Sequence, residues 1–216
     1  MHTTPTRPNP FQLADGRAQP SAMPRANMWL RAGLCAVFWG VFCGTTQAQS
    51  SSVASPNAAY SRPEVLALPG VMPTAPVRLR VWGFEVYDAR LWTPRGFRHT
   101  QSAQFPFALE LQYLRKLEGA AIASRSIDEM RRVGSFSDAQ AQTWLAAMRE
   151  LFPDVNTGER ITGVNLPGEG AEFWVNGQRV GLVKDEAFAR LFFGIWLDER
   201  SSQPKMRAQL LKGLQP

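Results

Sequence analysis

The segment Phe173-Trp-Val-Asn-Gly-Gln-Arg-Val-Gly-Leu-Val183 contains the clearest fold signal in the sequence. Its Asn176-Gly177 pair stands between two stretches of strand-forming residues, and a tight hairpin turn with positive φ favours this pair. The segment therefore predicts a β-hairpin with strands over 173–175 and 178–183. Strands joined by so short a turn run antiparallel, so the segment also predicts the type of sheet.

Strand patterns continue on the N-terminal side of this hairpin. Phe107–Leu114 alternates apolar and polar residues, and Arg160–Leu166 also has the composition of a strand. Val77–Trp82 alternates apolar residues with arginines, which predicts a strand with one wet or ligand-binding face. Gly83 then permits a turn, and Phe84–Thr93 continues as the next strand.

Helical spacing of apolar residues separates these strand patterns. Ser137 and Gln140 have the spacing of a capping box, which predicts a helix start. The predicted helices span 119–133, the segment from Ser137 to Pro153, 187–196, and a last segment from the cap Ser202 to about Gly213. The order β-β-β-α-α-β-β-β-α-α predicts one α+β domain over residues 63–214, built on an antiparallel sheet.

Composition excludes several classes of protein. The chain has 216 residues, of which 44% are hydrophobic and 19% charged, as is typical of a folded chain. Two cysteines rule out a disulfide-rich scaffold and a zinc site of four thiolates. Two histidines, His2 and His99, leave little room for a histidine-based metal site or a Ser-His-Asp triad. We therefore expect no metal site, and no motif implies a cofactor.

The first 48 residues have the pattern of a signal peptide with a long polar lead. Arg25 and Arg31 precede an apolar run over 33–43, and Thr46-Gln-Ala48 closes it with small residues. The alternative is a membrane anchor, but a spanning helix needs about 20 apolar residues, and this run is shorter. We therefore expect cleavage near Ala48, a periplasmic or secreted mature protein without a stable membrane anchor, and a linker over 49–62.

Cleavage would also change the charge balance. The whole chain has 24 Lys and Arg against 18 Asp and Glu, a net charge of +6. The leader carries four arginines and one aspartate, so the remaining 168 residues have a net charge of +3. This small excess removes the main support for nucleic-acid binding.

Three residues near Gly83 are candidates for a ligand site. Arg78, Arg80 and Tyr87 lie on adjacent predicted strands, and an arginine with a phenol can hold a carboxylate by charge-assisted hydrogen bonds. The simpler alternative is that both arginines extend from a sheet edge into water while Tyr87 packs normally. The residues alone favour this alternative.

Other conspicuous residues have structural interpretations. Asp128 and Glu129 stand among arginines at helical spacing, which predicts ion pairs on a solvated helix face. Three tryptophans lie on apolar stripes and are expected to pack in the core: Trp144, Trp174 and Trp196.

Six ordered blocks together resemble the bacterial chalcone isomerase-like proteins, over roughly residues 65–213. The blocks are Phe84–Trp92, Ala108–Leu114, Ile122–Met130, Phe152-Pro-Asp-Val with Gly158, Phe173–Gly177 and Phe193–Asp198. The resemblance implies an open-faced β-sandwich, in which helices cover one face of a large antiparallel sheet and a ligand cleft lies between them.

The same resemblance argues against chalcone cyclisation. Plant chalcone isomerases hold a phenolate and a water with Arg, Thr, Tyr, Lys, Asn and a late Ser or Thr. Matching the motifs places the Thr at Tyr87, the Tyr at Ile122, the Lys at Arg125, the Asn at Glu129 and the late Ser or Thr near Leu191. An isoleucine cannot hydrogen-bond a water, and a carboxylate repels a phenolate. We therefore assign no catalytic residue.

The fatty-acid-binding members of the family keep an Arg and replace the Thr by Tyr, and Tyr87 resembles that replacement. The resemblance thus implies that Arg80 or Arg78 pairs with Tyr87 to hold a carboxylate, with Arg125, Ile122 and Leu191 as further site residues. The leading hypothesis is an exported, non-catalytic binding protein for a fatty acid or similar apolar carboxylate. The alternatives are an isomerase or lyase that uses Tyr87, an arginine and Glu129, and a ligand-free interaction module whose protein partners the sequence does not name.

Overall fold

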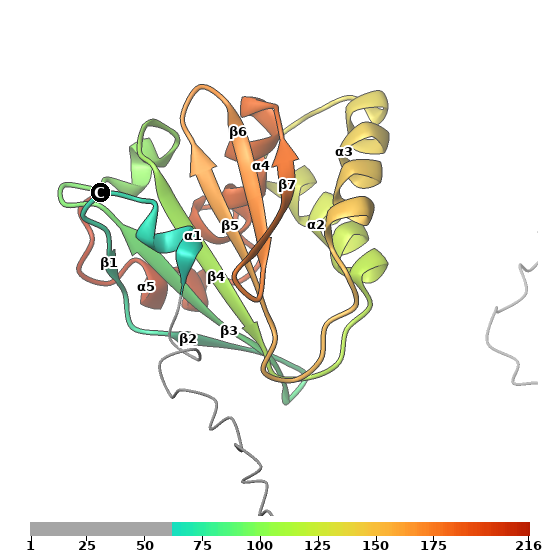
Figure 1. Ribbon diagram of the computed structural model, residues 1–216, viewed down its shortest axis with the longest axis horizontal. Coiled ribbons are helices and arrows are strands. Elements are labelled where there is room, and N and C mark those ends of the chain that lie inside the picture. Colours follow the sequence, from blue (N-terminus) through green and yellow to red (C-terminus); the bar gives the residue numbers. More distant parts are fainter. Residues whose placement is uncertain (1–61) are drawn as a thin grey trace, which may run out of the picture. The chain divides into compact units, whose positions relative to one another are not determined.

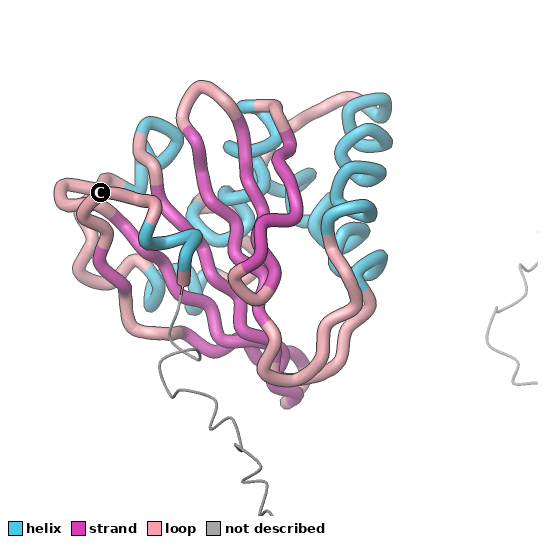
Figure 2. The backbone as a smooth tube through the Cα atoms, in the orientation of Figure 1, coloured by secondary structure: helices cyan, strands magenta, loops and turns pink. Residues whose placement is uncertain are grey.

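The computed structural model describes residues 62–216, which build a seven-stranded antiparallel sheet with helices on one face (Figures 1 and 2). The strand order is β1-β3-β4-β5-β6-β7, and β2 pairs with β3 beside β1. The strands are β1 (Met72–Pro73), β2 (Val77–Val81), β3 (Phe84–Thr93), β4 (Phe107–Tyr113), β5 (Arg160–Leu166), β6 (Gly170–Val175) and β7 (Gln178–Val183). The predicted α+β class and antiparallel sheet are confirmed.

Four helices cover one face of the sheet. They are α2 (Gly119–Val133), α3 (Asp138–Leu151), α4 (Glu186–Leu197) and α5 (Pro204–Leu210). Helix α4 is buried over most of its surface, because it contacts β6 on one side and α2 on the other. One large apolar cluster lies between the sheet and these helices, so the helical layer also supplies one wall of any cleft in the core.

Helix caps explain where α3 and α4 begin. Ser137 Oγ accepts a hydrogen bond from the Gln140 backbone N–H at 3.2 Å, and Gln140 Oε1 accepts from the Ser137 N–H at 3.0 Å. This is the predicted capping box. Asp185 caps α4 by accepting from two backbone N–H groups, and it also accepts from Trp144 Nε1 at 2.9 Å. Asp185 thereby joins the start of α4 to the buried face of α3.

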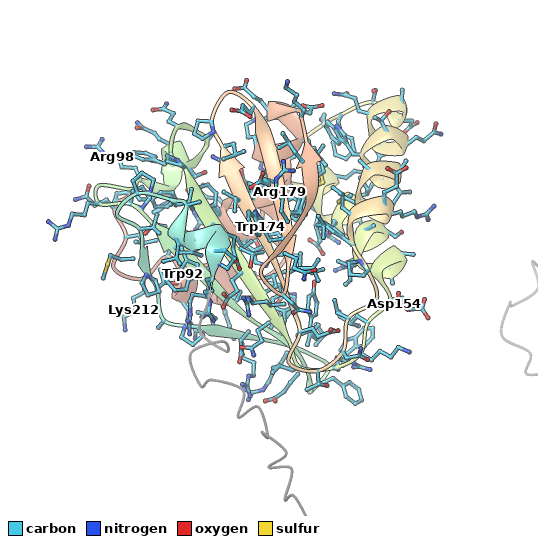
Figure 3. The ribbon with its side chains drawn as sticks, viewed as in Figure 1. Trp92, Arg98, Asp154, Trp174, Arg179 and Lys212 are labelled. Atoms are coloured by element: carbon cyan, nitrogen blue, oxygen red, sulfur yellow. The ribbon has the colours of Figure 1, made fainter. Side chains whose placement is uncertain are left out.

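The opposite face of the sheet carries only one short helix in the described part of the chain, α1 (Pro63–Leu66). Beneath it lies a small apolar cluster that includes Val65 and Val164, with Trp92 and Trp174 packed against it (Figure 3). A buried carboxylate also attaches α1 to the sheet, since Glu64 accepts from Thr162 Oγ1 at 3.1 Å. The face is therefore covered at its centre by residues just after the predicted linker.

Several sequence-based boundaries are wrong. The structure adds α1, β1 and the 3₁₀ helix η2 (His99–Gln104), each too short for a periodic pattern to be recognised. Strand β6 begins at Gly170 rather than at Phe173. Gln203, not Ser202, is the N-terminal cap residue of α5, because Pro204 is preorganised for the first helical turn. The helix ends at Leu210 rather than near Gly213.

The predicted signal peptide and most of the predicted linker lie outside the described residues. Between residues 62 and 216, no helix combines the length and the apolar character needed to cross a membrane.

Candidate functional site

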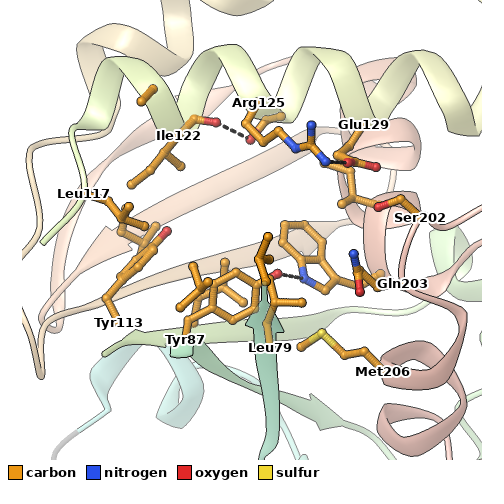
Figure 4. A pocket seen from close by; sticks show the side chains of 18 of the residues that line it. Leu79, Tyr87, Tyr113, Leu117, Ile122, Arg125, Glu129, Ser202, Gln203 and Met206 are labelled. Atoms are coloured by element: carbon orange, nitrogen blue, oxygen red, sulfur yellow. Dashed lines mark hydrogen bonds and ion pairs between the residues drawn. The ribbon is translucent and has the colours of Figure 1, made fainter. Parts of the chain in front are cut away.

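A pocket of about 330 Å³ lies between the sheet and the helical layer (Figure 4). Strands β2 to β5 supply its floor, and α2, α4 and α5 supply its walls and rim. Most of its lining is apolar, from aliphatic and aromatic residues: Leu79, Val81, Val86, Leu111, Tyr113, Leu117, Ile122, Phe152, Ile161, Phe192, Ile195, Trp196 and Met206. A concave, largely apolar pocket with few polar groups is typical of small-molecule sites.

The charged and amide side chains of the lining gather at one end of this pocket, whereas Tyr113 lies near Leu117. Arg125 and Glu129 lie along α2, and Ser202 and Gln203 come from the segment before α5 (Figure 4). Leu117 lies toward the other end of the pocket in the same view. The pocket is therefore amphipathic along its length, and an elongated ligand with one polar end would have a preferred orientation.

Tyr87 lines the floor of the pocket on β3. Its hydroxyl oxygen accepts a hydrogen bond from Trp196 Nε1 on α4 at 3.0 Å. Burial of this hydroxyl raises the pKa of Tyr87 to about 12, and the Trp196 N–H opposes that shift. The phenol is therefore neutral at physiological pH. Its own proton has no acceptor among the described protein groups, so it is available to a ligand oxygen.

Glu129 and Arg125 form an ion pair at the polar end, one helical turn apart on α2. Arg132 Nε also lies 3.6 Å from Glu129 Oε2. The predicted ion pairs are confirmed for Glu129 only, since Asp128 forms none among residues 62–216 and Arg131 pairs with Asp138 instead. The predicted solvated face is wrong for Glu129, whose side chain is 7% exposed. Its carboxylate lies under the helix while the Arg125 side chain is 65% exposed at the rim. Asp128 does occupy the solvated face.

The structure corrects the predicted pairing of Arg78 or Arg80 with Tyr87. Leu79 is the Cα partner of Tyr87 and lines the pocket, so the two flanking arginines project from the opposite face of the sheet. There Arg78 Nε donates to Asp88 Oδ1 at 2.8 Å, and Arg80 donates to Glu85 at 2.7 Å.

These ion pairs also change the ionisation of the acids on that face. Hydrogen bonds from Arg80, and to a smaller extent from Arg78, lower the pKa of Glu85. A hydrogen bond from Arg78 likewise lowers the pKa of Asp88. Both arginines therefore belong to an exposed ion-pair cluster on the outer face of the hairpin and lie away from the pocket.

The other predicted site residues divide in the same way. Ile122 and Arg125 line the pocket from α2. Leu191 does not, because its side chain is buried on α4 against Gly134. Ile195, one turn further along α4, lines the pocket instead.

Sequence reasoning missed the groups that α4 and α5 bring to the site. Trp196 was expected to pack in the core, and it does, but its N–H also positions the Tyr87 phenol. Ser202 was identified only as a helix cap, and Gln203 and Met206 had no signal, because these residues come from an irregular segment and a short helix. Among the described residues, no group of three or more His, Cys, Asp and Glu side chains could hold a metal ion.

A family model described as chalcone isomerase-like matches residues 49–212, which is most of the chain. The chain belongs to the chalcone isomerase-like family. Within this chalcone isomerase-like chain, Tyr87, Ile122, Arg125 and Glu129 all line the pocket between the sheet and the helices.

Two further similarities concern a bacterial protein and a solved plant structure. An uncharacterized protein of Haemophilus influenzae is 31% identical over 131 residues, which cover 60% of this chain. The chain spans 63% of the length of that relative. A solved structure of a fatty-acid binding protein from Arabidopsis thaliana is similar to 67% of this chain and to 85% of its own, with 15% identity and a TM-score of 0.47.

Proposed function

We propose that this chalcone isomerase-like protein binds a fatty acid or a similar apolar carboxylate in the pocket between sheet and helices. The observation that carries the proposal is the amphipathic lining, apolar along most of its length and polar at one end (Figure 4). Burial of an acyl chain against such a lining contributes roughly 25 cal/mol for each Å² of apolar surface removed from water. Removal of that surface from water would supply the binding free energy.

Arg125 is the cation best placed to receive the carboxylate. It lines the pocket, is exposed at the rim, and presents five N–H donors, so pairing with Glu129 leaves donors for a second acceptor. Tyr87, on the floor of the pocket across from α2, retains a hydroxyl proton that a ligand oxygen can accept (Figure 4). An arginine and a tyrosine thus serve the ligand, but the arginine comes from α2 instead of β2.

Glu129 distinguishes binding from catalysis. Its carboxylate competes with the ligand for Arg125, so Glu129→Gln should strengthen laurate binding by roughly fivefold to tenfold, a change of about 1 kcal/mol. Binding of dodecanol, which has no charge, should stay unchanged. The alternative function, an isomerase or lyase with Glu129 as its base, would instead lose turnover in this variant.

The test uses displacement of a fluorescent fatty acid from the full chain by laurate. Arg125→Gln should weaken laurate binding by roughly tenfold, because a charge-assisted hydrogen bond is lost. Ile122→Trp should abolish binding by filling the pocket, with circular dichroism confirming the fold.

Arg78→Gln is the matched control, since it removes the same charge from the opposite face of the sheet. Its affinity for laurate should equal that of the unmodified chain. Equal affinities in the Arg125→Gln and Arg78→Gln variants would refute the assigned carboxylate site.

Export is a separate part of the proposal. It is supported by the basic, apolar and small-residue segments that precede Ala48 in the sequence. The mass of the chain recovered from the envelope of an export-competent host tests it. A 168-residue product supports cleavage near Ala48, and a retained leader contradicts it.

A further inference from the structure

The hairpin between β2 and β3 ends in two aromatic residues that the fold leaves exposed. Trp82 is 94% exposed, and Phe84 is 62% exposed. Within residues 62–216, Trp82 makes no ring contact, cation–π contact or side-chain hydrogen bond. Burial in the core therefore does not explain the presence of a tryptophan at this tip.

The backbone of Trp82 makes this choice of residue still less expected. Trp82 has φ 49° and Gly83 has φ 85°, almost the same values as Asn176 (φ 51°) and Gly177 (φ 84°) in the β6–β7 hairpin. Turns of this geometry favour asparagine at the first position, and a bulky residue there is strained. The residue is strained and gains no packing in return, which suggests that Trp82 contacts another molecule.

The exposed aromatic tip continues into the pocket lining. Phe84 is the Cα partner of Val81, so the two side chains share one face of the hairpin. Val81 and Leu79, further along the same strand, line the pocket. Apolar side chains thus form a continuous path from the tip of the hairpin to the ligand site.

Two basic residues flank this path without acidic partners. The Arg115 guanidinium lies 5.4 Å from the centroid of the Phe84 ring, and Lys116 is exposed beside it. Neither residue has a carboxylate within ion-pair distance in the described chain, whereas Arg78 and Arg80 both pair with Glu85. The unpaired charge beside the aromatic tip is therefore positive.

We propose that the β2–β3 tip docks on the surface of an anionic lipid bilayer. Tryptophan side chains favour the membrane–water interface, and exposed Lys and Arg are attracted to anionic head groups. Trp82 and Phe84 would enter the interface, with Arg115 and Lys116 at the head groups. This docking rests on the proposed fatty-acid binding only for its role, which would be exchange of the ligand with the membrane.

The test compares the full chain with its Trp82→Asn variant on vesicles of phosphatidylethanolamine and phosphatidylglycerol that carry brominated acyl chains. Asparagine suits the turn, so this variant should keep its fold. Bromine quenches only tryptophans that reach the acyl region, and both chains share every other tryptophan. We expect quenching in the unmodified chain that the variant lacks, and a vesicle affinity that falls roughly tenfold.

Two controls separate the hairpin from general stickiness and from the ligand site. Met72 is another exposed apolar residue, 66% exposed, and it lies at the opposite end of the sheet edge that β1 and β2 form. Met72→Gln should change neither the bromine quenching nor the vesicle affinity. Lys116→Gln should weaken binding to these vesicles but not to neutral phosphatidylcholine vesicles.

The proposal would be overturned if quenching were equal in the unmodified chain and in Trp82→Asn, or if neither chain bound the vesicles. The exposed aromatic tip would then be a candidate site for a protein partner. Laurate binding in solution is measured on the same two chains and should be equal, because Trp82 does not line the pocket. If neither chain binds laurate, the proposed function is contradicted. The docking proposal is then still decided by the vesicle measurements alone.

Discussion

Tyr87 links the floor of the pocket to the helical layer through one hydrogen bond. Its ring borders the pocket, so the residue keeps partial exposure, while its hydroxyl is buried against Trp196. Because burial raises the pKa of Tyr87 to about 12 from the usual 10, the unfolded chain loses this proton first as pH rises. The stability that the neutral phenol contributes is complete below pH 10 and is lost between pH 10 and 12.

Tyr87→Phe should therefore have two effects on the free energy of unfolding. At neutral pH the variant should be less stable by about 1–2 kcal/mol, because the Trp196 N–H loses its acceptor. Between pH 10 and 12 its stability should fall less steeply than that of the unmodified chain, by about 2 kcal/mol in total. Urea unfolding at a series of pH values measures both effects.

Tyr113→Phe is the matched control at this scale. Burial also raises the pKa of Tyr113, but its hydroxyl makes no hydrogen bond to another described group. This variant should flatten the alkaline decline without the loss at neutral pH. An alkaline decline in Tyr87→Phe as steep as in the unmodified chain would contradict the assignment of the shifted phenol.

At the scale of elements, α3 depends on its N-terminal cap. Ser137→Ala removes the acceptor for the Gln140 N–H and should lower the free energy of unfolding by about 1 kcal/mol. Thr143→Ala removes a hydroxyl from the exposed middle of the same helix and should leave stability unchanged or slightly higher. Thermal unfolding of the two variants checks the difference, and equal losses would show that the cap contributes nothing.

Elements with a long periodic pattern or a defined turn were predictable from the sequence, and short elements were not. The pattern of Ala123, Ile127 and Met130 predicted α2 because a helix of this length repeats its buried face several times. Helix α1 and strand β1 are too short to repeat. Helix α1 forms against one face of the sheet, and β1 forms by pairing with β3 at its edge. Helix α5 was misplaced for the same reason, although it brings Met206 to the pocket.

At the scale of the whole described fold, the pocket joins the sheet to three helices, so ligand binding should stabilise the fold as a unit. Laurate at one hundred times its dissociation constant should add about 2.7 kcal/mol to the free energy of unfolding. For a domain of this size, that increase corresponds to a rise in Tm of roughly 5–10 °C. Differential scanning calorimetry measures the rise.

The Ile122→Trp variant provides the comparison for that measurement. Its filled pocket should leave Tm independent of laurate, while its unfolding without ligand stays cooperative. An equal rise in both chains would place the ligand elsewhere on the molecule.

The sequence by itself determined the α+β class, the antiparallel hairpins and the family resemblance, because local periodicity and turn chemistry act over a few neighbouring residues. It also identified Tyr87, Ile122 and Arg125, which the fold does bring to one pocket. Only the tertiary structure decided that Arg78 and Arg80 project from the other face. Which face of a strand meets a ligand depends on pairing register and on the layer packed against it, and both arise from contacts between residues far apart in the chain.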